Sequence, residues 1–396
     1  MYRKCSIGLL PAIILSLLLL PLGRLRASDS ISVSLLTCSP GEEVYTLFGH
    51  TAIRYENPRE GVDVVFNYGL FDFNTPHFML RFALGQTDYM LGLTPFDRFQ
   101  AEYRYYNRSV TSQHLALTST EATRLVEALQ TNYLPENRMY RYNYFYDNCS
   151  TRPFDQIEKA VEGRLVLPTE PKDGTYTYRD IMRLFARNHP WERFGMDLCL
   201  GFEADRPIDR RQTMFAPLFL FQALEQAHIQ RSSGSASLVD HTHLLVPATE
   251  SIHEATSWTP FRCFWLLFAA ISLASIYGIR RHRTLWAVDA LLLTSAGLVG
   301  SVLAFLALFS QHPTVGSNLL LWVFHPLHLA ALPWVIPQLR RGGRSRYLAF
   351  VAGSLTVFML FLPLLPQKID PAIVPLALCL LVRAGSHLVL TYKPRA

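Results

Sequence analysis

The fold of this chain depends on the segment YFYDNCSTR, residues 144–152. An aromatic run ends here in an Asn-Cys pair, and the apolar residues Phe154, Ile157 and Val161 then recur at helical spacing. This spacing predicts a helix whose N-terminus lies at Cys149. A thiol in that position is favoured as thiolate, because the helix dipole and the free backbone N–H groups stabilise negative charge. The segment therefore indicates a reactive cysteine.

A second segment, LFGHT at residues 47–51, supplies an imidazole at the start of a predicted strand. His50 beside Cys149 could take the thiol proton and hold it as imidazolium, which is the usual way in which a cysteine is activated for acyl transfer. The alternative interpretation is a buried core cysteine and an unrelated surface histidine, which is the commoner outcome for an arbitrary pair.

The strand that begins at His50 belongs to a predicted hairpin around the turn NPREG, residues 57–61. If residues 56 and 62 pair, Tyr68 lies opposite His50, whereas a slip of one residue places Asn67 there. Either side chain could fix the tautomer of the imidazole, as a catalytic histidine requires.

The composition indicates that part of the chain lies in water and part in lipid. Half of the 396 residues are apolar and only 17% are charged, which is low for a soluble protein. The net charge of +6 does not indicate nucleic acid, because the arginines gather beside apolar segments and no aromatic-basic motif appears. The six cysteines show no CxxC pair, so the sequence indicates neither a zinc site nor a disulfide framework, although a Cys38–Cys199 disulfide stays open.

Hydropathy separates the chain into segments. Residues 1–28 are basic, then apolar, and end in small residues, which is typical of a signal peptide or an N-terminal anchor. Residues 31–230 have the composition of an exported α/β domain, and residues 231–259 are predicted to be a polar linker. His241 and His243 lie two residues apart in this linker, and without a third ligand they do not indicate a metal site.

The last segment, residues 260–392, contains apolar runs that are each near the roughly 20 residues needed to cross a bilayer. The arginine-rich loops 280–283 and 340–346 and the basic tail are predicted to be cytoplasmic by the positive-inside rule. The alternate loops and the 31–230 domain then lie outside the cytoplasm. Five spans are predicted, at residues 260–279, 285–309, 318–336, 347–365 and 371–390.

Further motifs accompany the cysteine and the histidine: NYGLFDF at residues 67–73, Asn107-Arg108, and YRY at residues 140–142. With these motifs, residues 31 to about 230, and more loosely the membrane region, resemble the Bacteroides-type lipoprotein N-acyltransferases (Lnb-like). The resemblance implies an α+β, permuted papain-like (NlpC/P60-type) periplasmic domain, followed by an α-helical transmembrane bundle of five spans. It also implies a multi-pass protein of the bacterial inner membrane.

The resemblance implies roles for particular residues. Cys149 would be the nucleophile and His50 the base. Asn67 is the expected third catalytic group and Tyr68 its geometric alternative. No metal, no cofactor and no nucleic acid are expected. The candidates for substrate binding are Asn148, Tyr68, Arg152, whose guanidinium could hold a phosphate as a fork, and His312, in a loop outside the membrane.

The implied reaction suits a membrane protein. A Cys149 thiolate would take a fatty acyl chain from a membrane phospholipid, and the thioester would pass it to the α-amino group of a diacylglyceryl-cysteine lipoprotein. The alternatives are a membrane-anchored thiol hydrolase, either a phospholipase or a peptidoglycan peptidase, and a non-catalytic membrane scaffold. The Cys149 and His50 pair argues against the scaffold, and the five predicted spans argue against a peptidase.

Overall fold

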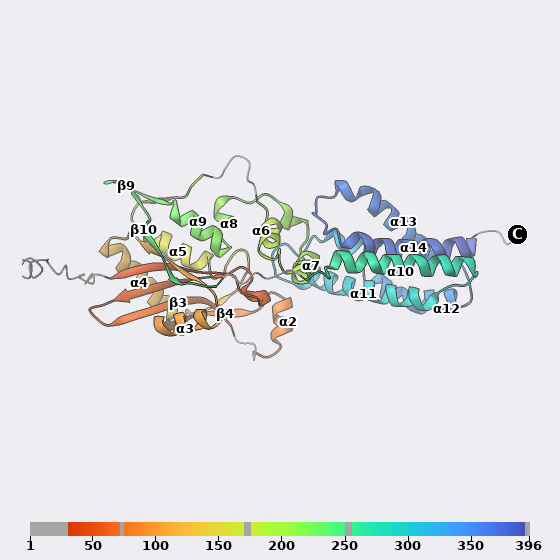
Figure 1. The fold of residues 1–396 in the computed structure, drawn as a ribbon, viewed down its shortest axis with the longest axis horizontal. Helices are drawn as coiled ribbons and strands as arrows, with labels where there is room; N and C mark the ends of the chain where they lie inside the picture. Colours follow the sequence, from red (N-terminus) through yellow and green to blue (C-terminus); the bar gives the residue numbers. More distant parts are fainter. Residues whose placement is uncertain (1–30, 72–74, 170–175, 250–255, 393–396) are drawn as a thin grey trace, which may run out of the picture.

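The computed structural model describes residues 31–71, 75–169, 176–249 and 256–392, so the predicted leader lies outside the described residues. Figure 1 shows two parts along the long axis of the molecule, an α+β domain at one end and a bundle of long helices at the other. This arrangement agrees with the predicted order of an α+β domain followed by membrane spans.

The first part is built on a seven-stranded antiparallel sheet with the strand order β10-β5-β1-β2-β3-β4-β6. Because β10 pairs with β5, the sheet is complete only when the chain has reached its last strand. The strands are β1 (Ser32–Cys38), β2 (His50–Asn57), β3 (Val62–Leu70), β4 (Asp88–Pro95), β5 (Val110–Leu115), β6 (Met139–Arg141) and β10 (Val239–Val246). A smaller sheet joins β7 (Arg164–Val166), β8 (His228–Arg231) and β9 (Gly234–Ser237).

Helices cover both faces of the large sheet, because successive strand residues point to opposite sides. Leu35 and Ile53 pack against α4 (Ser119–Tyr133), α5 (Thr151–Ala160) and α9 (Pro217–Glu225). Their neighbours Leu36 and Ala52 pack on the other side against α3 (Phe96–Tyr105). The remaining short helices are η1 (Val44–Thr46), α2 (Phe78–Ala83), α6 (Tyr178–Phe185), α7 (Pro190–Cys199), η2 (Phe202–Asp205) and α8 (Arg210–Thr213).

One sequence prediction is corrected in this domain. The predicted linker, residues 231–259, instead contains β9 and β10, because the alternating side chains of residues 239–246 pair with β5. Strand β6 ends at Arg141, and Asn143 then turns the chain. The Asn143 Oδ1 accepts hydrogen bonds from the N–H groups of Phe145 and Tyr146, at 3.1 and 3.0 Å.

The second part contains five helices, within the described residues, that are long and apolar enough to cross a membrane, and these match the five predicted runs. The third span is interrupted at Pro326, where the missing N–H and the ring prevent a continuous helix. The elements are α10 (Pro260–Arg280), α11 (Trp286–Phe309), η3 (Leu319–Trp322) with α12 (Leu327–Arg340), α13 (Arg346–Phe361) with η4 (Leu362–Leu364), and α14 (Ile373–Tyr392).

The two parts are joined by backbone contacts and buried polar side chains. Asn318 donates to the Leu198 carbonyl at 2.8 Å, and Gln367 donates to the Leu200 carbonyl at 3.0 Å. Gly201 lies so close to the loop before η3 that a Cβ there would be 2.7 Å from the Ser317 backbone. The loops predicted to lie outside the cytoplasm therefore face the α+β domain, and the arginine-rich loops lie at the far end of the bundle (Figure 1).

One ion pair is buried inside the bundle. The Arg383 guanidinium donates to both carboxylate oxygens of Asp289, at 2.7 and 3.0 Å, and to the Ser275 hydroxyl at 3.1 Å. These residues lie on α14, α11 and α10, and all three are buried. A paired charge is tolerated among apolar helices, whereas an unpaired one is costly. The pair therefore ties three spans together.

We predict that Arg383→Met destabilises the protein, because it leaves Asp289 charged and unpaired. Losing one partner of a buried pair typically costs roughly 3–5 kcal/mol. Thermal unfolding in detergent should show a lower midpoint for the single variant, and the double variant Asp289→Leu/Arg383→Met should recover most of the loss. A double variant as unstable as the single one would contradict this account.

Candidate active site

The cysteine is fixed by the side chain of the residue before it. Asn148 is buried, and its Oδ1 accepts from the N–H groups of Ser150 and Thr151 at 2.8 and 3.0 Å. Its Nδ2 donates to the carbonyls of Tyr144 and Phe215, at 2.8 and 2.9 Å. The amide thereby holds the turn that leads into α5, and Cys149 lies just before the N-cap of this helix, as predicted.

The imidazole is fixed by a glycine and an asparagine. His50 is the first residue of β2, and Gly49 before it has φ +84°, where a Cβ would lie 2.5 Å from the Cys38 carbonyl. The Nε2 of His50 lies 2.5 Å from Oδ1 of Asn67. Because an amide oxygen accepts, Nε2 carries the hydrogen, and Nδ1 is left for the thiol.

The cysteine and histidine segments meet at the end of the β2–β3 hairpin. Thr51 and Ser150 share a hydroxyl hydrogen bond of 3.0 Å, which joins β2 to α5. Gly69 lies against the cysteine, since a Cβ there would be 3.5 Å from the Cys149 Cβ. The side chains of His50 and Cys149 are hydrogen-bonded across this junction.

The electrostatics of the pair favour separated charges. Burial alone would raise the pKa of the Cys149 thiol, but the charge and hydrogen bond of His50, with hydrogen bonds from Thr51 and Ser150, lower it overall. Burial alone would lower the pKa of His50, but the thiolate and Asn67 raise it overall. Both shifts favour a thiolate beside an imidazolium, which is the form of an activated cysteine.

Other thiols of the domain behave differently. Burial raises the pKa of Cys38 to about 12 and also raises the pKa of Cys199. Both are free thiols, so the Cys38–Cys199 disulfide that the sequence left open is not formed. Neither environment activates its sulfur, in contrast to that of Cys149.

The hairpin register differs from both alternatives considered for the sequence. Glu56 pairs with Asp63, not with residue 62. Tyr68 points into the core, where it is 1% exposed and its hydroxyl accepts from Asn132 at 3.2 Å. Since Asn67 and Tyr68 are consecutive in β3, they point to opposite faces, and only Asn67 reaches His50. Tyr68 is therefore a core residue and not the partner of the imidazole.

Two other predicted substrate-binding residues are engaged by the protein itself. Arg152 forms a two-point ion pair with Asp147, at 2.5 and 2.7 Å, and its guanidinium lies 3.7 Å from the centre of the Tyr140 ring. The Arg152 guanidinium is therefore already paired within the protein. Asn148 is buried with its amide fully bonded, as described above. Both side chains position the cysteine segment.

His312 lies where the two parts of the molecule meet. Its Nε2 lies 2.6 Å from the Phe82 carbonyl, and its ring packs on that of Tyr144, with centroids 5.0 Å apart. The Tyr144 hydroxyl donates to the Pro313 carbonyl at 2.8 Å. Burial lowers the pKa of His312, which favours the neutral ring. The loop from α11 is thereby connected directly to the cysteine segment.

Sequence reasoning missed an aromatic wall beside the thiolate. The ring of Tyr89 stacks on that of Tyr142 at 4.1 Å and contacts that of Phe71 at 4.9 Å. Burial raises the pKa of Tyr89 to about 12, and the Cys149 charge adds to this shift. The motif YRY at residues 140–142 was the available signal, but only the pairing of β4 with β6 brings Tyr142 next to Tyr89.

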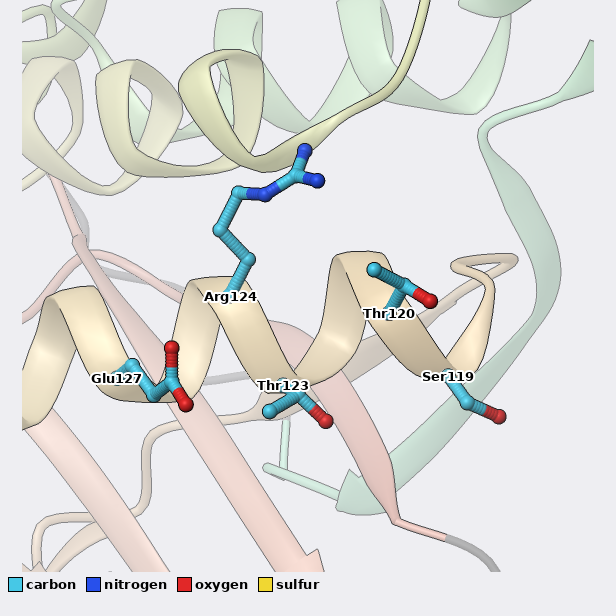
Figure 2. Close-up of a pocket in the computed structure, with 5 residues that line it drawn as sticks. All are labelled: Ser119, Thr120, Thr123, Arg124 and Glu127. Carbon is cyan, nitrogen blue, oxygen red and sulfur yellow. The ribbon is translucent and has the colours of Figure 1, made fainter.

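A surface hollow of about 410 Å³ lies elsewhere, along the first turns of α4 (Figure 2). Arg124, which lines it, donates to the Ala160 carbonyl at 3.0 Å and to Glu162 at 2.8 Å. None of the residues that line it belongs to the cysteine site, so we assign no catalysis to this hollow. The lining residues are Ser119, Thr120, Thr123, Arg124 and Glu127.

The chain combines an α+β domain, a Cys–His–Asn cluster and five candidate membrane spans. These features are those of a membrane-anchored thiol protein. Residues 24–183 match the family model of the Lnb N-terminal periplasmic domain, and residues 252–395 match that of the Lnb transmembrane domain. These matches cover most of the chain, and the protein belongs to the Lnb family. Its first part is periplasmic and its second part crosses the membrane with five spans. No match was found among curated proteins or solved structures.

We predict that Cys149 reacts with iodoacetamide at a pH below the range of an ordinary thiol. Its thiolate persists until the pH falls below the lowered pKa of this cysteine. In His50→Gln the imidazolium is lost while burial remains, so the onset of alkylation should move to higher pH. Mass spectrometry resolves each cysteine, and Cys199, whose pKa is raised, serves as the control in the same sample. An unchanged onset in His50→Gln would refute the charge pair.

Proposed function

We propose that this protein is a lipoprotein N-acyltransferase. It transfers a fatty acyl chain from a membrane phospholipid to the α-amino group of diacylglyceryl-cysteine lipoproteins, through a thioester on Cys149. Membership of the Lnb family implies lipoprotein N-acylation. The observation that supports the mechanism is the contact of Cys149 with His50, whose other ring nitrogen bonds Asn67. The periplasmic domain would be a permuted papain-like (NlpC/P60-type) unit, in which the strand with the histidine precedes the helix with the cysteine.

In the first half-reaction, the Cys149 thiolate attacks the ester carbonyl of the phospholipid. The ester C–O bond breaks, and the leaving alkoxide takes the proton from the His50 imidazolium to give a lysophospholipid. Ser150 and Thr151 give their N–H groups to Asn148, whereas no described residue accepts from the N–H of Cys149. That N–H is the proposed donor to the oxyanion.

In the second half-reaction, the α-amino group of the lipoprotein attacks the thioester. The C–S bond breaks, the amide forms, and neutral His50 accepts the proton that the amine loses. This step restores the thiolate and the imidazolium together. Asn67 keeps the hydrogen on Nε2, so that Nδ1 faces the sulfur in both steps.

The position of the site supports lipid substrates. Tyr144, five residues before Cys149, is bonded to the loop that follows α11, at the end of the bundle that faces the periplasm. A phospholipid ester and a lipoprotein N-terminus are both held at this level of the outer leaflet. A catalyst carried on five spans stays in the plane of its two substrates, which favours lipid chemistry over cell-wall peptide cleavage.

We predict that a reporter lipoprotein gains a third acyl chain when this protein is supplied to a host depleted of its own N-acyltransferase. Mass spectrometry of the N-terminal lipopeptide should show the chain with the intact protein and its absence with Cys149→Ala, at equal membrane expression. If the lipopeptide stays diacylated while lysophospholipid accumulates, the protein hydrolyses phospholipid and does not transfer the acyl chain.

We also predict that Asn67→Ala slows acyl transfer on the order of 10²-fold, the scale of a misplaced catalytic group. The loss arises because His50 no longer has its tautomer and orientation fixed. Tyr68→Phe is the matched control on the same strand, since it removes only the hydroxyl that accepts from Asn132. If Asn67→Ala and Tyr68→Phe transfer the acyl chain at equal rates, Asn67 has no role in the mechanism.

A further inference from the structure

A cluster of possible metal ligands lies on the large sheet, apart from the cysteine site. His114 of β5 and His241 of β10 are direct partners in the antiparallel register, and their rings stack with centroids 4.7 Å apart. The ligand atoms of these histidines and of Asp240 all lie within 4.8 Å of one another. The third ligand that the sequence lacked beside His241 is thus supplied by a strand more than a hundred residues earlier.

A β-bulge brings the carboxylate to the same side as the imidazoles. Neighbouring strand residues normally point to opposite faces, which would separate Asp240 from His241. The register shifts between Val239 and His241, however, so Asp240 is the extra residue of the bulge. Its Oδ2 lies 2.8 Å from Nδ1 of His241 and 4.0 Å from Nδ1 of His114.

The inner side of the cluster has an unused ligand atom. Nδ1 of His114 is buried and has no hydrogen-bond partner among the described residues. An imidazole nitrogen without a hydrogen-bond partner is available to coordinate a metal ion.

The chemistry of these donors selects a class of ion. A ligand set of two imidazoles and one carboxylate is typical of Zn²⁺ and similar first-row divalent ions. Water takes the open coordination position. A fourth donor is close, because the ring of His243 lies 4.7 Å from that of His241. Ca²⁺ and Mg²⁺ prefer oxygen ligands and do not fit this set.

We propose that His114, Asp240 and His241 form a binding site for a divalent transition metal, with Zn²⁺ as the ion of reference. The ion would link β10 to β5 at the edge of the sheet, where β10 has a neighbour on one side only. His114 is aligned with Arg54, four residues along β2 from His50, so the strand geometry separates the two sites by on the order of 15 Å. The metal would therefore stabilise the strand and take no part in acyl transfer.

The test uses the full chain in detergent, after treatment with EDTA, in a Cys149→Ala background. This background removes the thiolate, which would itself bind Zn²⁺ with His50. Calorimetric titration with ZnCl₂ should show one site, and His241→Ala or Asp240→Asn should weaken it at least tenfold. Both residues are exposed, so these substitutions leave the core intact. His228→Ala, at an exposed histidine of β8, is the control and should bind as the parent does.

A second measurement identifies the ligands. Co²⁺ in the same protein should give a visible spectrum of nitrogen and oxygen coordination without thiolate charge transfer, and His241→Ala should abolish it. Zn²⁺ should also raise the thermal midpoint of the parent and leave that of His241→Ala unchanged. The absence of a titratable site, or binding that His241→Ala does not weaken, would overturn the proposal.

Discussion

The contact between Cys149 and His50 is the interaction that the candidate active site of the periplasmic domain is built around. Two segments about a hundred residues apart must be held in contact, and separated charges are stable at a half-buried site only while they face each other. The structure meets this need from both sides. Asn148 fixes the turn before α5, and Gly49 allows the chain to enter β2 with the imidazole already in place.

Hydrogen bonds and ion pairs also connect the periplasmic domain to the membrane bundle. Arg179 is 1% exposed, is paired with Asp197 and Asp205, and donates to two carbonyls of the segment that contacts the spans. Asn318 and Gln367 bond that segment from the bundle side. The periplasmic domain is therefore not suspended on a flexible linker but seated on the ends of the helices.

The sequence was sufficient where local chemistry determines structure. The hairpin around residues 57–61, the helix that follows Cys149 and the five spans were all predictable. The sequence was insufficient where pairing between segments far apart in the chain determines the structure. The alternating segment of β10 resembles a polar linker until β5 is placed beside it. The surroundings of Tyr68 and Arg152 could not be predicted, because the strand register and a local ion pair, neither visible in composition, determine where these side chains lie.

The position of β10 also determines the order in which the molecule is assembled. Because this edge strand is the last of the sheet in sequence, the sheet cannot be completed until residue 246 has crossed the membrane. The first span, α10, begins only a short distance later, at Pro260. The strand that completes the sheet and the first span are thus close neighbours in the sequence. The sheet acquires its final edge as the chain becomes fixed in the bilayer.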